Sequence, residues 1–291
     1  MINKTRVSAL AFVLMIATTT ASSVTAQATE NKGKVLIVLS SESVLPLTNG
    51  QTFKTGYYLN ELIVPAQRFT AAGYRLVFAN PTGNTPTVDQ ASVSPDYFNG
   101  SKVKLDQALK YRSSLDGLKH PITLRWAADH DLNQYAAVFV PGGPAPMIDL
   151  MADRNLGRIL SYFHTHAKPT VLLCHAPIVL LSTTHDPKLE QAALRVGDLP
   201  KAQKLASDWP YRDYRLTVFS DEEEEQAAKN VFHAEPQFLP ALALKNAGGQ
   251  VSTVAAWHSK VVQDRELITG QNPFSDSALM DAVLSMMQGK L

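Results

Sequence analysis

The feature that most constrains the fold of this sequence is the repeated alternation of short apolar runs with segments of helical periodicity. Residues 34–40 (KVLIVLS), 136–140 (AAVFV) and 214–219 (YRLTVF) are rich in β-branched and aromatic residues, which is typical of buried strands. Residues 59–72 instead place apolar side chains at helical spacing, and Gly73 follows where a helix would end. Strands that alternate with helices predict an α/β fold with a mostly parallel sheet and helices on both faces.

The length and the charge of the chain narrow the classes of protein. The chain has 291 residues, of which 45% are hydrophobic, and its formal net charge is +1. That apolar share suffices for a sizeable core, and the near-zero charge argues against nucleic acid as a partner. We expect one domain over residues 32–290, with loop insertions near residues 94–130 and 186–212.

The first residues have the pattern of a secretory signal peptide. Lys4 and Arg6 precede the apolar run 9–17, which is too short to span a bilayer. Small residues follow and allow cleavage after Ala26 or Ala28. We therefore expect residues 1–28 to be a signal peptide and the mature protein to be periplasmic or secreted, without a membrane anchor after cleavage.

The single cysteine, Cys174, stands where a strand is predicted to turn into a helix. The apolar run 170–173 (TVLL) precedes it, and residues 177–183 are predicted to be helical. A cysteine at such a turn lies at the carboxyl end of the sheet and near a helix N-terminus, which favours the reactive thiolate. His175 follows directly and could orient or protonate a reacting group. The alternative is an inert, buried cysteine beside a surface histidine.

Two further segments could complete a site around Cys174. Residues 141–144 (PGGP) end the preceding strand, and glycines there allow backbone N–H groups to approach a ligand as in an oxyanion hole. Glu61 lies on the helix after the first strand, where a partly buried carboxyl group could move a proton. The alternatives are a plain turn and a solvated carboxylate.

Other candidate binding residues carry weaker signals. His164 and His166 lie two positions apart on a predicted helix, which points them to different faces and makes them a poor metal pair. The three tryptophans, Trp126, Trp209 and Trp257, are expected to pack in the core or in the insertions. Residues 251–256, just before the last of them, are predicted to form a strand.

Several blocks of the sequence closely resemble the ThiJ/PfpI superfamily, in the branch of glyoxalase III-type and heat-shock-chaperone-like proteins. They occur in the family's order over nearly the whole predicted mature chain. The blocks are residues 56–65 (GYYLNELIVP), 72–74, 80–83 (NPTG), 140–143 (VPGG), 146–150, 168–169, Cys174-His175, 218–224 (VFSDEEE) and 267–273 (LITGQNP). The chain has PGGPA where the branch usually has PGGHG, and CHAP where CHGP is usual.

The resemblance implies a fold and a set of site residues. The fold would be a flavodoxin-like three-layer sandwich of the class I glutamine amidotransferase type. Cys174 would be the nucleophile, with Glu61 close to the thiol and His175 next in sequence, and N–H groups of Gly142, Gly143 and Ala176 would line the oxyanion pocket. An acidic partner of His175 would come from the run Asp221, Glu222, Glu223 and Glu224, although these residues equally suit a solvated helix start.

The resemblance also implies an activity. The thiolate would attack a methylglyoxal-type 2-oxoaldehyde to give a hemithioacetal, and hydrolysis would release lactate, without glutathione, metal or organic cofactor. One alternative is an exported stress protein without turnover that binds unfolded protein clients or senses oxidation. A third interpretation, an amidase or peptidase, depends on the cysteine turn alone. Relatives are often dimers, which leaves a homodimer open.

Overall fold

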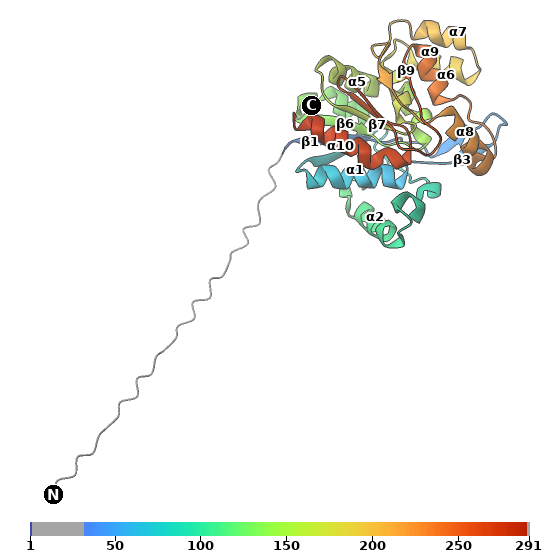
Figure 1. Cartoon of the computed structure of the whole chain (residues 1–291). Helices are drawn as coiled ribbons and strands as arrows, with labels where there is room; N and C mark the ends of the chain where they lie inside the picture. The colour runs from blue at the N-terminus through green and yellow to red at the C-terminus, as the bar shows by residue number, and fades with distance from the viewer. Residues whose placement is uncertain (2–31, 290–291) are drawn as a thin grey trace. The chain divides into compact units, whose positions relative to one another are not determined.

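A twisted, mostly parallel sheet forms the centre of the computed structural model, which describes Met1 and residues 32–289 (Figure 1). The predicted signal peptide and its cleavage positions lie outside the described residues. In spatial order the strands are β10 (Val261–Asp264), β11 (Leu267–Gly270), β7 (Thr170–Leu173), β6 (Tyr135–Val140), β1 (Lys34–Val38), β4 (Arg75–Asn80) and β5 (Ile122–Thr123).

The pairing within this sheet confirms the predicted fold class. The strands from β5 to β11 pair in parallel, and only the edge strand β10 runs antiparallel to its neighbour β11. Successive side chains of β1 enter two separate cores: Leu36 and Val38 belong to one, Val35 and Ile37 to the other. Both faces of the sheet are therefore covered, because a strand with alternating buried side chains needs a core on each side.

Helices form the two outer layers. On one face α1 and α10 lie side by side (Figure 1), and α5 packs in the core of the opposite face. Helix α1 continues through Pro65. The α-helices are α1 (Leu59–Ala71), α2 (Lys102–Ser114), α3 (Asp116–Lys119), α4 (Leu124–Asp129), α5 (Arg154–Thr165), α6 (Pro187–Arg195), α7 (Leu199–Leu205), α8 (Asp221–Ala227), α9 (Pro240–Ala247) and α10 (Asp276–Met287).

Shorter elements connect these layers. Two small ribbons pair β2 (Val44–Pro46) with β3 (Thr52–Lys54), and β8 (Arg215–Leu216) with β9 (Gln250–Val251). The segments predicted as insertions contain α2, α3 and α4 in the first case and α6 and α7 in the second. The short helical turns are η1 (Gln90–Ser92), η2 (Pro95–Phe98), η3 (Leu132–Gln134), η4 (Ala145–Met147), η5 (Leu150–Ala152), η6 (Ala176–Thr183), the π-type η7 (Ala228–Phe232) and η8 (Pro273–Ser275).

Three predicted elements differ in the structure. The helix expected at 177–183 is the 3₁₀ helix η6, which is buried almost all round and has no polar face. The strand expected at 214–219 shrinks to β8, because the Thr217 N–H donates to the side chain of Thr269 instead of a backbone carbonyl. The strand expected at 251–256 reduces to β9, and the residues after Val251 are irregular. None of the helices in the described part of the chain is long and apolar enough to cross a membrane.

Candidate active site

Cys174 occupies a sharp turn at the carboxyl end of β7. Its backbone φ is +61°, a left-handed conformation that is uncommon for residues other than glycine. The Cys174 N–H donates to the Gly270 carbonyl and its carbonyl accepts from the Phe219 N–H, each over 2.9 Å, so the end of β11 and the segment after β8 hold the turn. The residue is only 1% exposed. This geometry matches the strand–turn–helix arrangement in which nucleophiles are presented.

Glu61, in the first turn of α1, places its carboxyl group against the thiol of Cys174. Its carboxyl group is fully buried, contacts Cys174 and accepts a hydrogen bond from the Gly142 N–H over 2.9 Å. Burial raises the pKa of Glu61 to about 8, because ionisation away from water is costly. Burial, and next the negative charge of Glu61, raise the pKa of the Cys174 thiol well above its ordinary value. The pair therefore holds protons tightly at neutral pH.

Gly142, in the loop after β6, packs tightly against Cys174 and Glu61. A Cβ atom at Gly142 would lie 2.6 Å from the Cys174 Cβ and 2.7 Å from Glu61 Oε2, so only glycine fits there. Gly143 adopts φ +87°, and its N–H donates to the Cys174 sulfur. Of the predicted oxyanion groups, the Gly142 N–H is thus engaged by Glu61 and that of Gly143 faces the thiol. Ala176 lies buried at the start of η6.

His175 lies on the other side of the sulfur and is itself buried. Its Nδ1 is 3.2 Å from the Cys174 Sγ, and its Nε2 is 3.1 Å from Glu224 Oε1. The second contact lacks hydrogen-bond geometry, so it is a close approach of the two side chains rather than a hydrogen bond. The imidazole stacks on Phe219, with ring centroids 4.3 Å apart and an interplanar angle of 25°.

The structure separates the four acids that the sequence left open as partners of His175. Only Glu224 reaches the imidazole. Asp221 pairs with Lys245 over 3.3 Å, and Glu222 accepts from the Ala256 N–H over 3.2 Å. Glu223 caps its own helix through Ser220 and also binds the side chain of Asn272, the backbone N–H of Trp257 and the amide of Gln271.

Two groups near the thiol were missed by the sequence reasoning. Tyr58, just before α1, lies close enough to Cys174 for their charges to interact, and burial raises the pKa of its phenol well above the ordinary value. Asp89 is buried, accepts from the Thr55 hydroxyl over 2.8 Å, and has a pKa raised by burial. Tyr58 falls within the block 56–65 that resembles the family, three positions before Glu61, and that position was the available signal.

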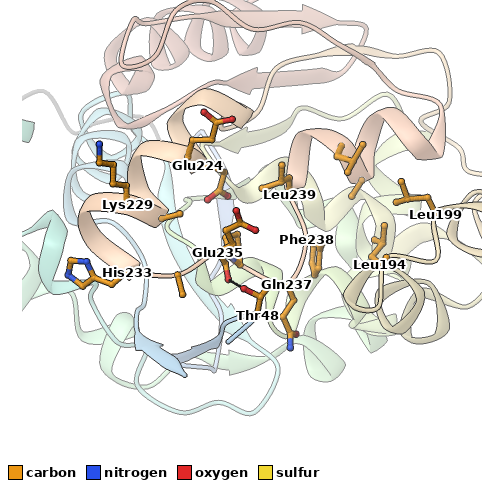
Figure 2. A pocket seen from close by; sticks show the side chains of 17 residues that line it. Thr48, Leu194, Leu199, Glu224, Lys229, His233, Glu235, Gln237, Phe238 and Leu239 are labelled. Carbon is orange, nitrogen blue, oxygen red and sulfur yellow. Dashed lines mark hydrogen bonds between the residues drawn. The ribbon is translucent and has the colours of Figure 1, made fainter. Parts of the chain in front are cut away.

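A cavity of about 740 Å³ adjoins the acidic side of the site (Figure 2). Its wall is apolar along Leu194, Leu199 and Leu239 and polar along Lys229 and His233. Glu224 borders this cavity, but both of its carboxylate oxygens are shielded from solvent. Cys174 and Glu61 do not line it. The cavity therefore contacts the site only through Glu224.

No group of three or more potential metal ligands gathers among the described residues. His164 Nδ1 lies 2.8 Å from Glu266 Oε1 and 3.1 Å from the Tyr214 hydroxyl. His166 instead contacts the Tyr162 carbonyl over 2.8 Å. The two histidines thus point to different neighbours, as their spacing on α5 predicts.

Comparison with known proteins gives three informative similarities. The protein/nucleic acid deglycase HchA of Pseudomonas aeruginosa is 27% identical over 84% of this chain and 78% of its own. HchA of Staphylococcus aureus is 26% identical over 90% of this chain and 83% of its own. The crystal structure of glyoxalase III from Candida albicans is 21% identical and has a TM-score of 0.60, covering 88% of this chain and 97% of that one.

Fold and site together define a flavodoxin-like α/β protein with a buried cysteine on a strand–turn–helix elbow beside a buried glutamate. The sequence profile described as "ThiJ/PfpI family-like" matches residues 53–196, which include Glu61, Cys174 and His175. By this match, residues 53–196 of the chain belong to the ThiJ/PfpI family.

Proposed function

We propose that this protein is a glutathione-independent glyoxalase that converts methylglyoxal-type 2-oxoaldehydes to 2-hydroxy acids. The observation that carries the proposal is the convergence of Glu61, Gly143 and His175 on the sulfur of Cys174. A nucleophile, a proton acceptor on one side and a carboxyl group on the other are the groups that such a reaction needs.

The first step in the proposal forms a bond between Sγ and the aldehyde carbon. For this step we assign the proton of the neutral imidazole to Nε2, 3.1 Å from Glu224 Oε1, so that Nδ1 can accept the thiol proton 3.2 Å from the sulfur. His175 takes the thiol proton as the sulfur attacks and returns it to the aldehyde oxygen. The product is a neutral hemithioacetal, and removing the proton in this way avoids a free thiolate in a buried site.

In the second step Glu61, in its ionised form, removes the proton from the former aldehyde carbon. The electron pair moves to the adjacent carbonyl oxygen, which gives an enediolate. The proton of the neighbouring hydroxyl group moves to that oxygen, and Glu61 returns its proton to the adjacent carbon. These transfers leave a thioester of the 2-hydroxy acid and restore the Glu61 carboxylate. Water then cleaves the thioester and restores the thiol. A carboxyl group with a pKa of about 8 is a stronger base than an ordinary glutamate and is still partly ionised at neutral pH.

The names of the curated relatives favour a second candidate function. Both bacterial HchA proteins are described as protein/nucleic acid deglycases and match this chain at 26–27% identity. A deglycase could use the same thiol and carboxyl group, because sugar-type adducts also present a carbonyl carbon to a nucleophile. The two functions differ in whether the carbonyl compound is free or attached to an amino or thiol group.

The decisive experiment supplies each substrate separately. Purified protein that lacks residues 1–28 would be incubated with methylglyoxal in the absence of glutathione, and lactate would be measured. We expect lactate from the natural chain and none from Cys174→Ala. Release of unmodified amine from a pre-formed methylglyoxal–peptide adduct, without lactate from free methylglyoxal, would instead select the deglycase. Suppression of client aggregation with neither reaction would favour the non-catalytic stress protein.

We also propose that the enzyme acts outside the cytoplasm. Lys4, Arg6 and the apolar run 9–17 support export. Cell fractionation followed by N-terminal sequencing tests this point, and we expect a mature chain that starts at Gln27 or Thr29. Recovery of the unprocessed chain from the cytoplasm would overturn it.

A further inference from the structure

Trp257 has a backbone and a side chain that core packing does not explain. Its φ is +64°, which is strained for a bulky side chain. Its indole ring is nevertheless 36% exposed, whereas the sequence analysis expected it to be packed. Such strain persists only where the surroundings impose it, and strained residues cluster at active sites and ligand-binding segments.

The surroundings of Trp257 fix the ring without covering it. The backbone N–H donates to Glu223 Oε1 over 2.8 Å, and the indole N–H donates to Gln226 over 2.6 Å. Glu223 is fully buried and also binds Asn272, so one carboxylate ties the irregular segment after β9 to the loop after β11. The ring is therefore held in one orientation and presents apolar surface, as a preorganised contact residue does.

Trp257 belongs to a chain of aromatic rings that extends from one side of Cys174 to the other. Phe219, which stacks on His175, lies 5.7 Å from Trp257. The ring of Phe274 lies 6.5 Å from Trp257 at an angle of 90° and is 42% exposed.

The chain of rings continues from Phe274 to Tyr97, with centroids 5.7 Å apart, and from Tyr97 to Tyr58 over 5.5 Å. Tyr58 interacts with Cys174. We call Tyr97, Trp257 and Phe274 the aromatic rim. These three residues come from η2, the segment after β9 and η8, so segments far apart in the sequence meet in one aromatic cluster.

The position of the aromatic rim suits contact with the substituent of a bound aldehyde. Tyr97 lies close enough to Cys174 for their charges to interact, so the part of a substrate beyond the attacked aldehyde carbon would first meet the rim at this ring. A methyl group contacts little of that surface, whereas a flat aryl group can pack on ring faces and edges. Aromatic contacts of this kind add specificity beyond the area that they bury.

We propose that the aromatic rim binds the substituent of the substrate and selects 2-oxoaldehydes that carry an aryl group over methylglyoxal. This inference rests on the proposed glyoxalase function and names its substrate class. With two ring contacts, we expect the kcat/KM for phenylglyoxal to exceed that for methylglyoxal by roughly 10-fold.

The test compares both aldehydes in the natural chain and in two rim variants, Trp257→Asn and Phe274→Ala. Asparagine tolerates the left-handed backbone, so the first variant removes the ring without adding strain. Conversion of phenylglyoxal to mandelate should lose roughly 10-fold in kcat/KM, and conversion of methylglyoxal to lactate should change less than about twofold. The matched control is Trp126→Ala, because Trp126 is also exposed but stacks on His130 outside the rim, and it should change neither rate.

Equal losses for both aldehydes in the rim variants would assign the rim to structure and overturn the inference. A natural chain without an aryl preference would also overturn the inference. So would rim variants that lose only the suppression of client aggregation, because the rim would then bind polypeptides and not the substrate. Lactate formation without aryl preference would leave the proposed glyoxalase function standing. Turnover of neither aldehyde would end both proposals. Thermal unfolding of each variant identifies losses that come from misfolding.

Discussion

The surroundings of Cys174 and the cavity beside Glu224 are opposite kinds of site. The first is nearly closed, its thiol and two glutamates are buried, and the pKa values of Cys174 and Glu61 are strongly raised. The second has a volume of about 740 Å³ and mixed apolar and charged walls, but neither the thiol nor Glu61 borders it (Figure 2). The comparison teaches that the candidate active site is located by side chains that converge on one atom and have shifted pKa values. The volume of a cavity does not locate it.

Among substitutions that test the difference between the two regions, removal of the thiol should cause the largest loss of activity. We expect Cys174→Ala to lower kcat for lactate formation on the order of 10⁴-fold or more, because no bond to the aldehyde carbon can form. Steady-state kinetics with methylglyoxal measure this loss. A variant that retains a tenth of the activity would show that the buried centre is not where the reaction occurs.

Glu61→Gln should have the second-largest effect, a loss of about 10³-fold in kcat/KM, because glutamine fills the same volume but cannot accept a proton. In the natural chain the ionised carboxylate is the active form. The kcat/KM should therefore fall as the pH drops below about 8 and reach a plateau above it. A pH profile that is flat between pH 6 and 9 would contradict the role of Glu61 as the base.

Glu61 should also make the folded state sensitive to pH. Its pKa is raised in the folded state, from 4.5 to about 8, so the folded chain binds the proton more tightly than the unfolded chain. The free energy of unfolding should accordingly fall as the pH rises from about 4.5 to 8, by on the order of 3–5 kcal/mol from this group. Urea unfolding at pH 5 and pH 8.5 measures the change, and Glu61→Gln should remove most of it.

Glu224→Gln tests the residue that belongs to both regions. We expect a loss of roughly 10-fold in kcat, because the carboxylate no longer stabilises the protonated His175. Glu225→Gln is the matched control: Glu225 is exposed, lines the cavity and should leave kcat unchanged. If both variants lost activity equally, the cavity rather than the contact with His175 would be responsible.

The smallest effect should come from the cavity wall. Leu242 is 41% exposed and lines the cavity, so Leu242→Glu places a charge there without disturbing the core. Activity with methylglyoxal should change less than about twofold, because the thiol lies elsewhere. A loss of 10-fold or more in kcat/KM would show that the cavity takes part in the reaction after all.

Sequence reasoning reached the parallel sheet and brought Glu61, Cys174 and His175 into consideration, because each follows a strand or begins a helix. It could not choose among Asp221 to Glu224. Consecutive residues of a helix point about 100° apart, and only the docking of α8 decides that Glu224 meets His175. It also missed the exposure of Trp257, because a left-handed residue in an irregular segment has no periodic signal.

The burial of Cys174 gives the molecule a built-in reporter of its own fluctuations. The chain contains one cysteine, and that thiol is 1% exposed beneath the turn that joins β7 to η6. A bulky thiol reagent can modify it only during transient openings of the structure, as an amide exchanges its hydrogen only when its bond breaks. The rate of labelling under native conditions, compared with the rate in the unfolded chain, therefore measures how often the centre of the sheet opens, in a protein that needs no engineered probe.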